Sequence, residues 1–323
     1  MLASFLAALF FALNATCASH SVRASGSARA NLGRLVVAAL VLGAFAHTLG
    51  GGFASASTGW FLLSGVIGMG LGDLGGYGAL PLLGSRLTVL MTQCLAAPIA
   101  ALGEWLWLDT RLTAAQLLWG GVILTGVAVA LMPGRARPPR VRVRPAGFLF
   151  GLLAAAGQGL GALVSRRGVL AADAAGEAAH NAVFGLTAAY QRILAGLAFT
   201  ALWFLALRLL RRPPEGAPNS ASSVPIQRHL INDAVSSTSP GIARRRARGW
   251  MLANGFAGPV LGVGCYQWAL ATTPSGLVLP IAATTPLLSI PIAFWLEGDR
   301  PSRRAIAGAA IAVAGCIALT LVR

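Results

Sequence analysis

The chain has 323 residues, of which 56% are hydrophobic and 11% are charged, and its mean hydropathy is +0.72. Because a soluble globular domain carries about 25% charged residues, this composition excludes an ordinary soluble domain and indicates a membrane protein. The formal net charge is +16, but all 25 basic residues are arginines that lie between apolar segments and not on a foldable basic domain, so we expect no nucleic-acid binding.

Ten apolar segments are long enough to cross a membrane, whose hydrocarbon core of about 30 Å requires about 20 helical residues. The first segment could instead be a cleaved signal peptide, but it lacks the positively charged start of such peptides, and we expect it to be retained. We therefore predict a multi-pass protein of the cell inner (plasma) membrane. The segments are Leu2–Ala18, Leu32–Leu49, Trp60–Leu83, Leu87–Leu108, Ala114–Leu131, Gly147–Leu163, Val183–Leu209, Gly249–Ala269, Gly276–Leu296 and Ala305–Leu321.

Two polar stretches interrupt this series. Residues 133–145 (PGRARPPRVRVRP) form a basic, proline-rich linker, and residues 211–248 are rich in arginine, serine and proline, a composition typical of disorder. The linker separates five segments from five. We predict a first five-helix half at residues 1–132, the linker at 133–145, and a second five-helix half at 146–323 that contains the disordered insert at 211–248.

The two predicted halves contain the same features in the same order. Residues 72–131 and 261–321 each hold a glycine-rich segment with a tyrosine, an apolar segment with an X-Pro pair, a tryptophan, a turn with an acid and an arginine, and a last segment of small residues. Since five crossings are an odd number, the halves must have opposite orientations in the membrane. The predicted fold is an all-α membrane protein of about ten transmembrane helices, arranged as a 5+5 inverted repeat.

Several motifs of this repeat carry a family resemblance. They are Gly72-Asp73 with Tyr77-Gly-Ala-Leu, Gly84-Ser-Arg-Leu-Thr leading to Ala97-Pro98, Tyr190-Gln-Arg-Ile-Leu-Ala-Gly, and Thr285-Pro286 leading to Glu297-Gly-Asp-Arg. Together they resemble the EamA family of the drug/metabolite transporter superfamily, over the whole chain except the insert. One departure is Asp109-Thr110-Arg111, where the family usually shows Gly-Glu-Arg. The resemblance implies a ten-helix transporter and says little about its substrate.

The arginines are distributed unevenly over the two sides of the predicted bundle. Twenty fall in one set of alternate loops, and the other set holds Arg111, Arg166, Arg167, Arg192 and Arg323. By the positive-inside rule, this count would place both termini outside. The family resemblance implies both termini inside. The two indications disagree, and 13 of the 20 arginines lie in the linker and the insert, so the orientation stays open.

Two acids fall within predicted membrane segments, where a charged side chain costs about 2.5–3.5 kcal/mol and is a functional candidate. Asp73 lies among glycines and is a candidate protonation site or binding group for a cation; pairing with Arg34 or with a buried amide is the structural alternative. Glu104 lies nearer the predicted membrane edge. It either lines a pathway or anchors this edge together with Trp105 and Trp107.

Other candidates occupy matching positions in the two halves. The paired amides could bind a polar solute or join helices, the paired arginines could contact a lipid headgroup or an anionic substrate, and the paired prolines could act as hinges or as static kinks. These pairs are Asn14 with Gln158, Arg34 with Arg192, and Pro98 with Pro286. Further pathway candidates, with core packing as the alternative, are Tyr77, Gln93, Tyr266, Gln267 and Trp268.

The expected function is secondary transport by alternating access, with export of a small metabolite or drug-like solute and with Asp73 as a means of proton coupling. The alternatives are a non-transporting scaffold or regulator and, with less support, a membrane-embedded enzyme, since neither H-E-x-x-H nor G-x-S-x-G occurs. The absence of lysine excludes a P-loop and ATP-driven pumping by this chain. We expect a small-molecule substrate, the lipid bilayer and a homodimer as partners, and no cofactor or metal, because the four cysteines lie in apolar segments without C-x-x-C.

Overall fold

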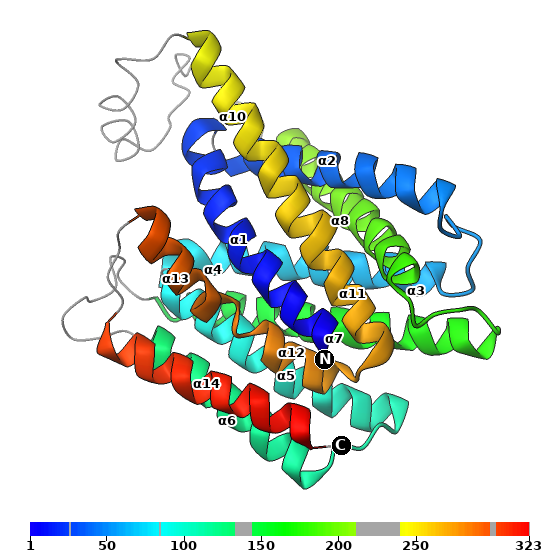
Figure 1. Cartoon of the computed structure of the whole chain (residues 1–323). Coiled ribbons are helices and arrows are strands. Elements are labelled where there is room, and N and C mark those ends of the chain that lie inside the picture. The colour runs from blue at the N-terminus through cyan, green and yellow to red at the C-terminus, as the bar shows by residue number, and fades with distance from the viewer. Residues whose placement is uncertain (26, 84, 133–143, 211–239, 298–301, 323) are drawn as a thin grey trace.

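The computed structural model describes residues 1–25, 27–83, 85–132, 144–210, 240–297 and 302–322. Within these ranges the chain is helical and forms a single bundle (Figure 1). The first half contains α1 (Leu2–Ser25), α2 (Ser27–Thr48), α3 (Thr58–Gly65), η1 (Val66–Leu71), α4 (Gly72–Leu83), α5 (Ser85–Leu108) and α6 (Ala114–Leu131). The second half contains α7 (Ala146–Ala174), α8 (Ala182–Leu210), α10 (Pro240–Gly255), η2 (Phe256–Gly262), α11 (Val263–Thr272), α12 (Ser275–Ala282), α13 (Thr285–Glu297) and α14 (Arg303–Leu321).

Eight segments of the described chain are long and apolar enough to cross a membrane. They are Ala30–Thr48, Thr58–Leu83, Leu87–Leu108, Ala114–Leu131, Ala146–Ala174, Ala182–Trp203, Ser275–Ile292 and Arg303–Leu321. Two more helices complete the ten: α1, whose apolar part is Leu2–Ala18, and the continuous helix formed by α10, η2 and α11. The predicted all-α fold with ten membrane helices is confirmed.

The two ends of the bundle are distinguished by the chain termini. Figure 1 shows the N and C labels close together at one end, which we call the termini end. At the opposite end, which we call the linker end, α6 finishes and α7 begins; there the backbone N–H of Arg144 donates to the carbonyl of Leu82, at a distance of 3.0 Å. Of the predicted insert, residues 211–239 lie outside the described residues, and Pro240–Arg248 form the first turns of α10.

Each half contains a π-helix at the same point of its third membrane helix. The π-helix η1 separates α3 from α4, and η2 separates α10 from α11. Each packs on the first helix of the other half: a Cβ on Gly157 of α7 would lie only 2.5 Å from the Cα of Gly72, directly after η1, and Gly258 of η2 contacts the side chain of Asn14 on α1. This exchange of partners is the arrangement expected for two inverted repeats.

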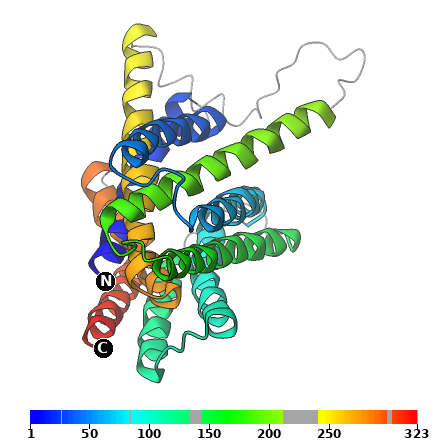
Figure 2. The same ribbon diagram turned by 90° about the vertical axis from the view of Figure 1, so that its right-hand side faces the viewer.

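The last helices of the two halves, α6 and α14, pack directly against each other (Figures 1 and 2). A Cβ on Gly308 of α14 would lie 2.5 Å from the carbonyl oxygen of Gly126 on α6, and a Cβ on Gly126 would lie 2.5 Å from the backbone nitrogen of Ala312. Small residues let membrane helices approach closely where there is no hydrophobic driving force between them. Glycine at these positions therefore allows the last helices of the two halves to pack closely.

Candidate functional site

A cavity of about 420 Å³ lies between the two halves. The first half contributes lining residues from α1, η1, α4 and α5, and the second half from α7, α8 and α11. The cavity extends from Thr88 and Val89, near the linker end of α5, to Tyr266, near the termini end of α11. Its lining consists of Phe11, Gly68, Met69, Gly72, Asp73, Gly76, Thr88, Val89, Thr92, Gln93, Ala154, Gln158, Arg192, Val263 and Tyr266.

Arg192 carries a positive charge into this cavity. Its side chain is only 5% exposed, and its Nη1 donates to Oε1 of Gln267 at 2.9 Å and to the hydroxyl of Ser165 at 3.4 Å. The Nε atom of the same guanidinium is buried and has no hydrogen-bond partner among the described residues. Contact with a lipid headgroup, one of the two roles expected for Arg192, is thereby excluded in this structure, because the guanidinium lies inside the bundle.

Three residues hold the Arg192 guanidinium in place. Gln267 accepts from Arg192 and donates from Nε2 to the Ser165 hydroxyl at 3.1 Å, and Ser165 in turn lies 2.7 Å from the hydroxyl of Ser64 on α3. Gly68 of η1 leaves the room that the guanidinium needs, since a Cβ there would lie 2.6 Å from Nη2. A buried polar group without a hydrogen-bond partner destabilises the protein. The hydrogen-bond network therefore holds the guanidinium of Arg192 in one orientation.

Asp73 lies in the same cavity, in the first turn of α4 directly after η1. Its carboxylate interacts electrostatically with Arg34 and Arg192 but forms no ion pair with any of the described basic side chains. The carboxylate is thus a partly compensated charge that retains free acceptor positions. A solute in the cavity could use these positions.

Two further polar features complete the site. Nε2 of Gln158 on α7 donates to Oε1 of Gln93 on α5 at 2.9 Å, so the predicted pathway amides bond to each other across the two halves. The Tyr266 hydroxyl is buried without a partner among the described residues, and the guanidinium carbon of Arg192 lies 5.9 Å from the centre of its ring. An unpartnered buried hydroxyl beside a guanidinium is the kind of exception that calls for a bound ligand or water.

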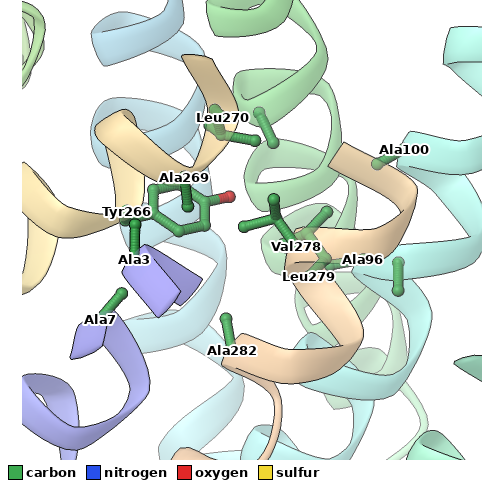
Figure 3. Packing of buried hydrophobic residues seen from close by; sticks show 12 residues of the cluster. Ala3, Ala7, Ala96, Ala100, Tyr266, Ala269, Leu270, Val278, Leu279 and Ala282 are labelled. Carbon is green, nitrogen blue, oxygen red and sulfur yellow. The ribbon is translucent and has the colours of Figure 1, made fainter. Parts of the chain in front are cut away.

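An apolar cluster closes the cavity towards the termini end. Figure 3 shows Tyr266 together with small residues of α1, α5, α11 and α12 that pack into this region. We call this cluster the alanine plug; it consists of Ala3, Ala7, Ala96, Ala97, Ala100, Ala162, Tyr266, Ala269, Leu270, Val278, Leu279 and Ala282. The small alanine side chains allow the five helices α1, α5, α7, α11 and α12 to meet closely. Tyr266 belongs to the plug and also lines the cavity.

Hydrogen bonds between the loops reinforce this closure. Glu177, in the loop between α7 and α8, accepts from the Ser55 hydroxyl at 2.5 Å and from the backbone N–H of Ala56 at 2.8 Å, both in the loop between α2 and α3. Nε2 of Gln191 donates to the carbonyl of Gly52 at 2.7 Å. These three bonds join the second half to the first at the termini end, and we call them the loop latch.

Glu104 lies outside the cavity and has a different role from those expected. It is fully buried, and its two carboxylate oxygens accept from the backbone N–H groups of Ser275 at 2.7 Å and Gly276 at 3.1 Å, where α12 begins. A carboxylate at a helix N-terminus satisfies free N–H groups and complements the helix dipole. On the other side of the same turn, Arg166 donates to the carbonyls of Leu270 and Ala271 at 2.8 and 3.0 Å, where α11 ends.

Three other predicted site residues, Asn14, Arg34 and Trp268, are partly buried and lie outside the cavity lining. Asn14 packs on η2 and Trp268 packs beside the alanine plug, while Nε of Arg34 donates to Asn31 at 2.8 Å. The side chain of Tyr77 lies outside the described residues.

The two paired prolines differ in their surroundings. Pro98 is exposed on the surface of the unbroken α5, whereas Pro286 is the second residue of α13, beyond a break that follows α12. A proline is tolerated in the first turn of a helix, and Pro286 lies at such a position, where a new helix begins after the break. Pro98 is on the outer surface of α5 and does not line the cavity.

Three side chains at the cavity or in its hydrogen-bond network were not among the predicted site residues. Thr88 and Thr92 line the cavity, and Ser165 positions both Gln267 and Arg192. Ser165 corresponds to Ser21 in the internal repeat, and that match was the signal that could have pointed to it. The threonines carry no comparable signal.

No group of three or more His, Cys, Asp or Glu residues in the described part of the chain could hold a metal ion. The profile of the EamA-like transporter family matches residues 145–321, which is more than half of the chain. The chain belongs to the EamA-like transporter family. This membership makes it a multi-pass membrane transporter and not an enzyme.

A solved crystal structure resembles this EamA-like transporter over its whole length. The similarity covers 99% of this chain and 96% of the other, with a TM-score of 0.66 and 18% sequence identity. At this identity the likeness concerns the fold alone. No curated protein sequence matches the chain.

Proposed function

We propose that this chain is a secondary transporter that moves a small polar metabolite or drug-like solute through the cavity by alternating access. The observation that carries the proposal is the placement of Arg192 and Asp73, two opposite charges, in a cavity between the halves that is closed towards one end. Residues 1–132 and 146–323 act as the two inverted halves, and movement of one against the other exposes the cavity to each side in turn.

The chemistry of the cavity favours a solute with a hydrogen-bond acceptor or negative group at one end. Arg192 and the Tyr266 hydroxyl both offer unfilled donor capacity in the part of the cavity next to the alanine plug. Towards Asp73, the solute would meet a carboxylate that accepts hydrogen bonds.

Asp73 is also the group through which export would be coupled to protons across the inner membrane. A carboxylate that shares a cavity with Arg192 can bind either a proton or a donor group of the solute, but not both in the same position. Solute and proton would then exchange on Asp73, which is the requirement for antiport.

The test is flux of radiolabelled small metabolites in proteoliposomes with and without an imposed pH gradient. Asp73→Asn and Arg192→Gln are expected to lower the initial rate at least tenfold. The matched controls are Asp109→Asn and Arg111→Gln, which remove one partner each of an exposed ion pair of 3.8 Å outside the cavity and should leave the rate unchanged.

Three results separate the parts of the proposal. Flux that is lost equally in the control variants would refute a role for the cavity. Flux that persists in Asp73→Asn and ignores the gradient would remove proton coupling while leaving transport intact. Absence of flux for every solute of a broad metabolite panel would refute the transport function.

A further inference from the structure

A second, smaller cavity lies at the termini end, beside the loop latch. It has a volume of about 170 Å³ and is bordered by the loop between α2 and α3, the loop between α7 and α8, and the first turns of α8. We call it the latch cavity, because Glu177 and Gln191 of the loop latch both line it. Among the described residues, none lines both this cavity and the one that holds Arg192. A pocket for a drug-sized molecule has roughly 300–1,000 Å³, so the latch cavity suits a much smaller ligand.

Gln191 directs an unused acceptor to this cavity. Its side chain is fully buried, and Nε2 donates to the carbonyl of Gly52 at 2.7 Å and to the hydroxyl of Thr58 at 3.2 Å. Because the carbonyl of Gly52 can only accept, the amide nitrogen must face it, which fixes the position of Oε1. Oε1 is buried and has no hydrogen-bond partner among the described residues. A buried acceptor of this kind calls for a bound ligand or water.

Glu177 adds a negative charge that the described residues do not neutralise. Its carboxylate accepts from the Ser55 hydroxyl and from the backbone N–H of Ala56, but it forms no ion pair with any described basic side chain. No arginine or histidine is among the residues that line the latch cavity. Since each carboxylate oxygen can accept more than one bond, Glu177 retains acceptor positions.

Two hydroxyl groups add further oxygen atoms. The Thr187 hydroxyl is buried and donates to the carbonyl of Val183 at 2.9 Å, so its proton is used and its lone pairs remain. Gly50 leaves this hydroxyl open to the cavity, since a Cβ at Gly50 would overlap it. From the first half, Ser57 contributes a buried hydroxyl beside that of Ser55. The cavity is therefore lined by acceptors from both halves.

The donor set selects the kind of ligand. Carboxylate, hydroxyl and amide oxygens are the ligands that hard metal cations prefer, and the charge of the ligand set is matched to that of the ion. Glu177 supplies one negative charge, while Gln191, Thr187 and Ser57 are neutral. This set compensates one positive charge and falls short of the charge of Ca²⁺ or Mg²⁺.

We propose that the latch cavity is a binding site for a small monovalent cation, Na⁺, held by Glu177 and Gln191 together with the neighbouring hydroxyls. The ion would join the α7–α8 loop and α8 of the second half to the α2–α3 loop of the first half. A ligand that binds only the closed arrangement of these loops stabilises that arrangement by mass action. Na⁺ therefore closes the termini end, by a site that is independent of Asp73 and of proton coupling.

Thermal unfolding of the purified protein in detergent tests the site. NaCl replaces N-methyl-D-glucamine chloride at constant ionic strength, so that only the cation changes. We expect a saturable rise in the unfolding temperature, of roughly 2–3 °C at ten times the dissociation constant. Glu177→Gln, which removes the charge, and Thr187→Val, which removes a hydroxyl, should abolish this Na⁺-dependent rise whatever their temperature without Na⁺.

Two matched controls lie outside the latch cavity and should keep the rise. Asp173→Asn removes the same charge from the last turn of α7, where Asp173 lies 3.2 Å from His180. Thr200→Val removes a hydroxyl that donates to a carbonyl of its own helix α8, as that of Thr187 does. A rise that persists in Glu177→Gln and Thr187→Val, or that is absent from the unmodified protein, would overturn the proposal. A rise produced by CaCl₂ and not by NaCl would overturn the monovalent assignment.

Cysteine labelling tests the effect of the ion on the loops. Ala188, which lines the latch cavity, is changed to cysteine in a background with Cys17, Cys94, Cys265 and Cys316 changed to alanine. At ten times its dissociation constant, Na⁺ should slow the reaction with a maleimide about elevenfold, and the added change Glu177→Gln should remove this protection. A labelling rate that ignores Na⁺ would contradict closure by the ion. Neither measurement depends on solute flux, so the outcome is separate from that of the transport test.

Discussion

Arg192 on α8 and Gln267 on α11 are joined by a hydrogen bond of 2.9 Å between Nη1 and Oε1. The bond links the second and third membrane helices of the second half at the depth of the cavity. Because the bond occupies Nη1 while Nε has no hydrogen-bond partner among the described residues, Nε is the atom of the guanidinium that remains available to donate to a solute. Four predictions follow from this site and its surroundings.

Replacement of Gln267 by methionine should destabilise the protein and impair transport. The change removes the acceptor of Arg192 and leaves Nη1 with the longer bond to Ser165, at a cost of about 1.5–3 kcal/mol for a hydrogen bond to a charged group. Thermal unfolding of the purified protein in detergent measures the effect. Gln267→Glu keeps an acceptor and should unfold close to the wild-type temperature; equal losses in both variants would contradict the assigned bond.

Gly68→Ala should reduce transport without unfolding the protein. Its Cβ would lie 2.6 Å from Nη2 of Arg192, so the guanidinium must move, and the free end of this long side chain can do so at modest cost. We expect an increase of about tenfold in KM, measured as flux in proteoliposomes. Gly121→Ala on α6 is the matched control, since nothing lies within 4 Å of the added Cβ. A similar KM for the two variants would show that Arg192 need not be held in position.

Glu104→Gln should lower the unfolding temperature, although Glu104 lies outside the cavity. The buried carboxylate accepts from two N–H groups at the start of α12, and glutamine can satisfy only one of them without the charge, so we expect a loss of about 1–3 kcal/mol. Differential scanning fluorimetry in detergent is the measurement. Asp109→Asn, which changes an exposed acid at the end of the same helix, should have no comparable effect.

Glu177→Ala should shift the protein towards a state that is open at the termini end. It removes two bonds of the loop latch, and because Glu177 is half-exposed we assign their loss about 1 kcal/mol, or roughly a fivefold change in the population of the open state. A reporter cysteine at Ala188, which is 2% exposed and lies behind the latch, should react correspondingly faster with a maleimide. Glu177→Gln retains one acceptor and should show a smaller increase; no increase in either variant would argue against the latch.

The fold was predictable from the sequence where a single property, such as the length of an apolar segment, determines the structure. The length of the apolar segments identified the ten helices, and the order of Tyr77, Pro98 and their counterparts identified the two halves. The same repeat did not reveal that Pro98 lies within a continuous helix while Pro286 follows a break, because both have the same local sequence signal. At the break, the hydroxyls of Thr284 and Thr285 donate to the carbonyls of Ile281 and Ala282, and α5 has no corresponding interruption before Pro98.

The site was predicted in part. Asp73, Gln93, Gln158 and Tyr266 line the cavity as expected, because polar residues in apolar helices tend to face the interior of a bundle. Glu104 does not line the cavity. Its position in the sequence predicted its depth in the membrane but not the face of α5 on which it lies. Asn14 differs from its repeat partner Gln158 for a related reason: η2 covers it, and neither π-helix has a sequence signal that we could recognise.

The paired π-helices also set the angular position of everything that follows them. A helix advances by roughly 100° per residue, and a π-turn accommodates one residue more than an α-turn. If an α-helix replaced the π-turn at Val66–Leu71 without a change in length, Asp73 would rotate by roughly 100° away from Arg192, whereas deletion of one residue together with the π-turn would keep Asp73 on the same face; the same holds for Phe256–Gly262 and Tyr266. Each wide turn therefore absorbs one residue, and in this way keeps Asp73 and Tyr266 directed towards the cavity.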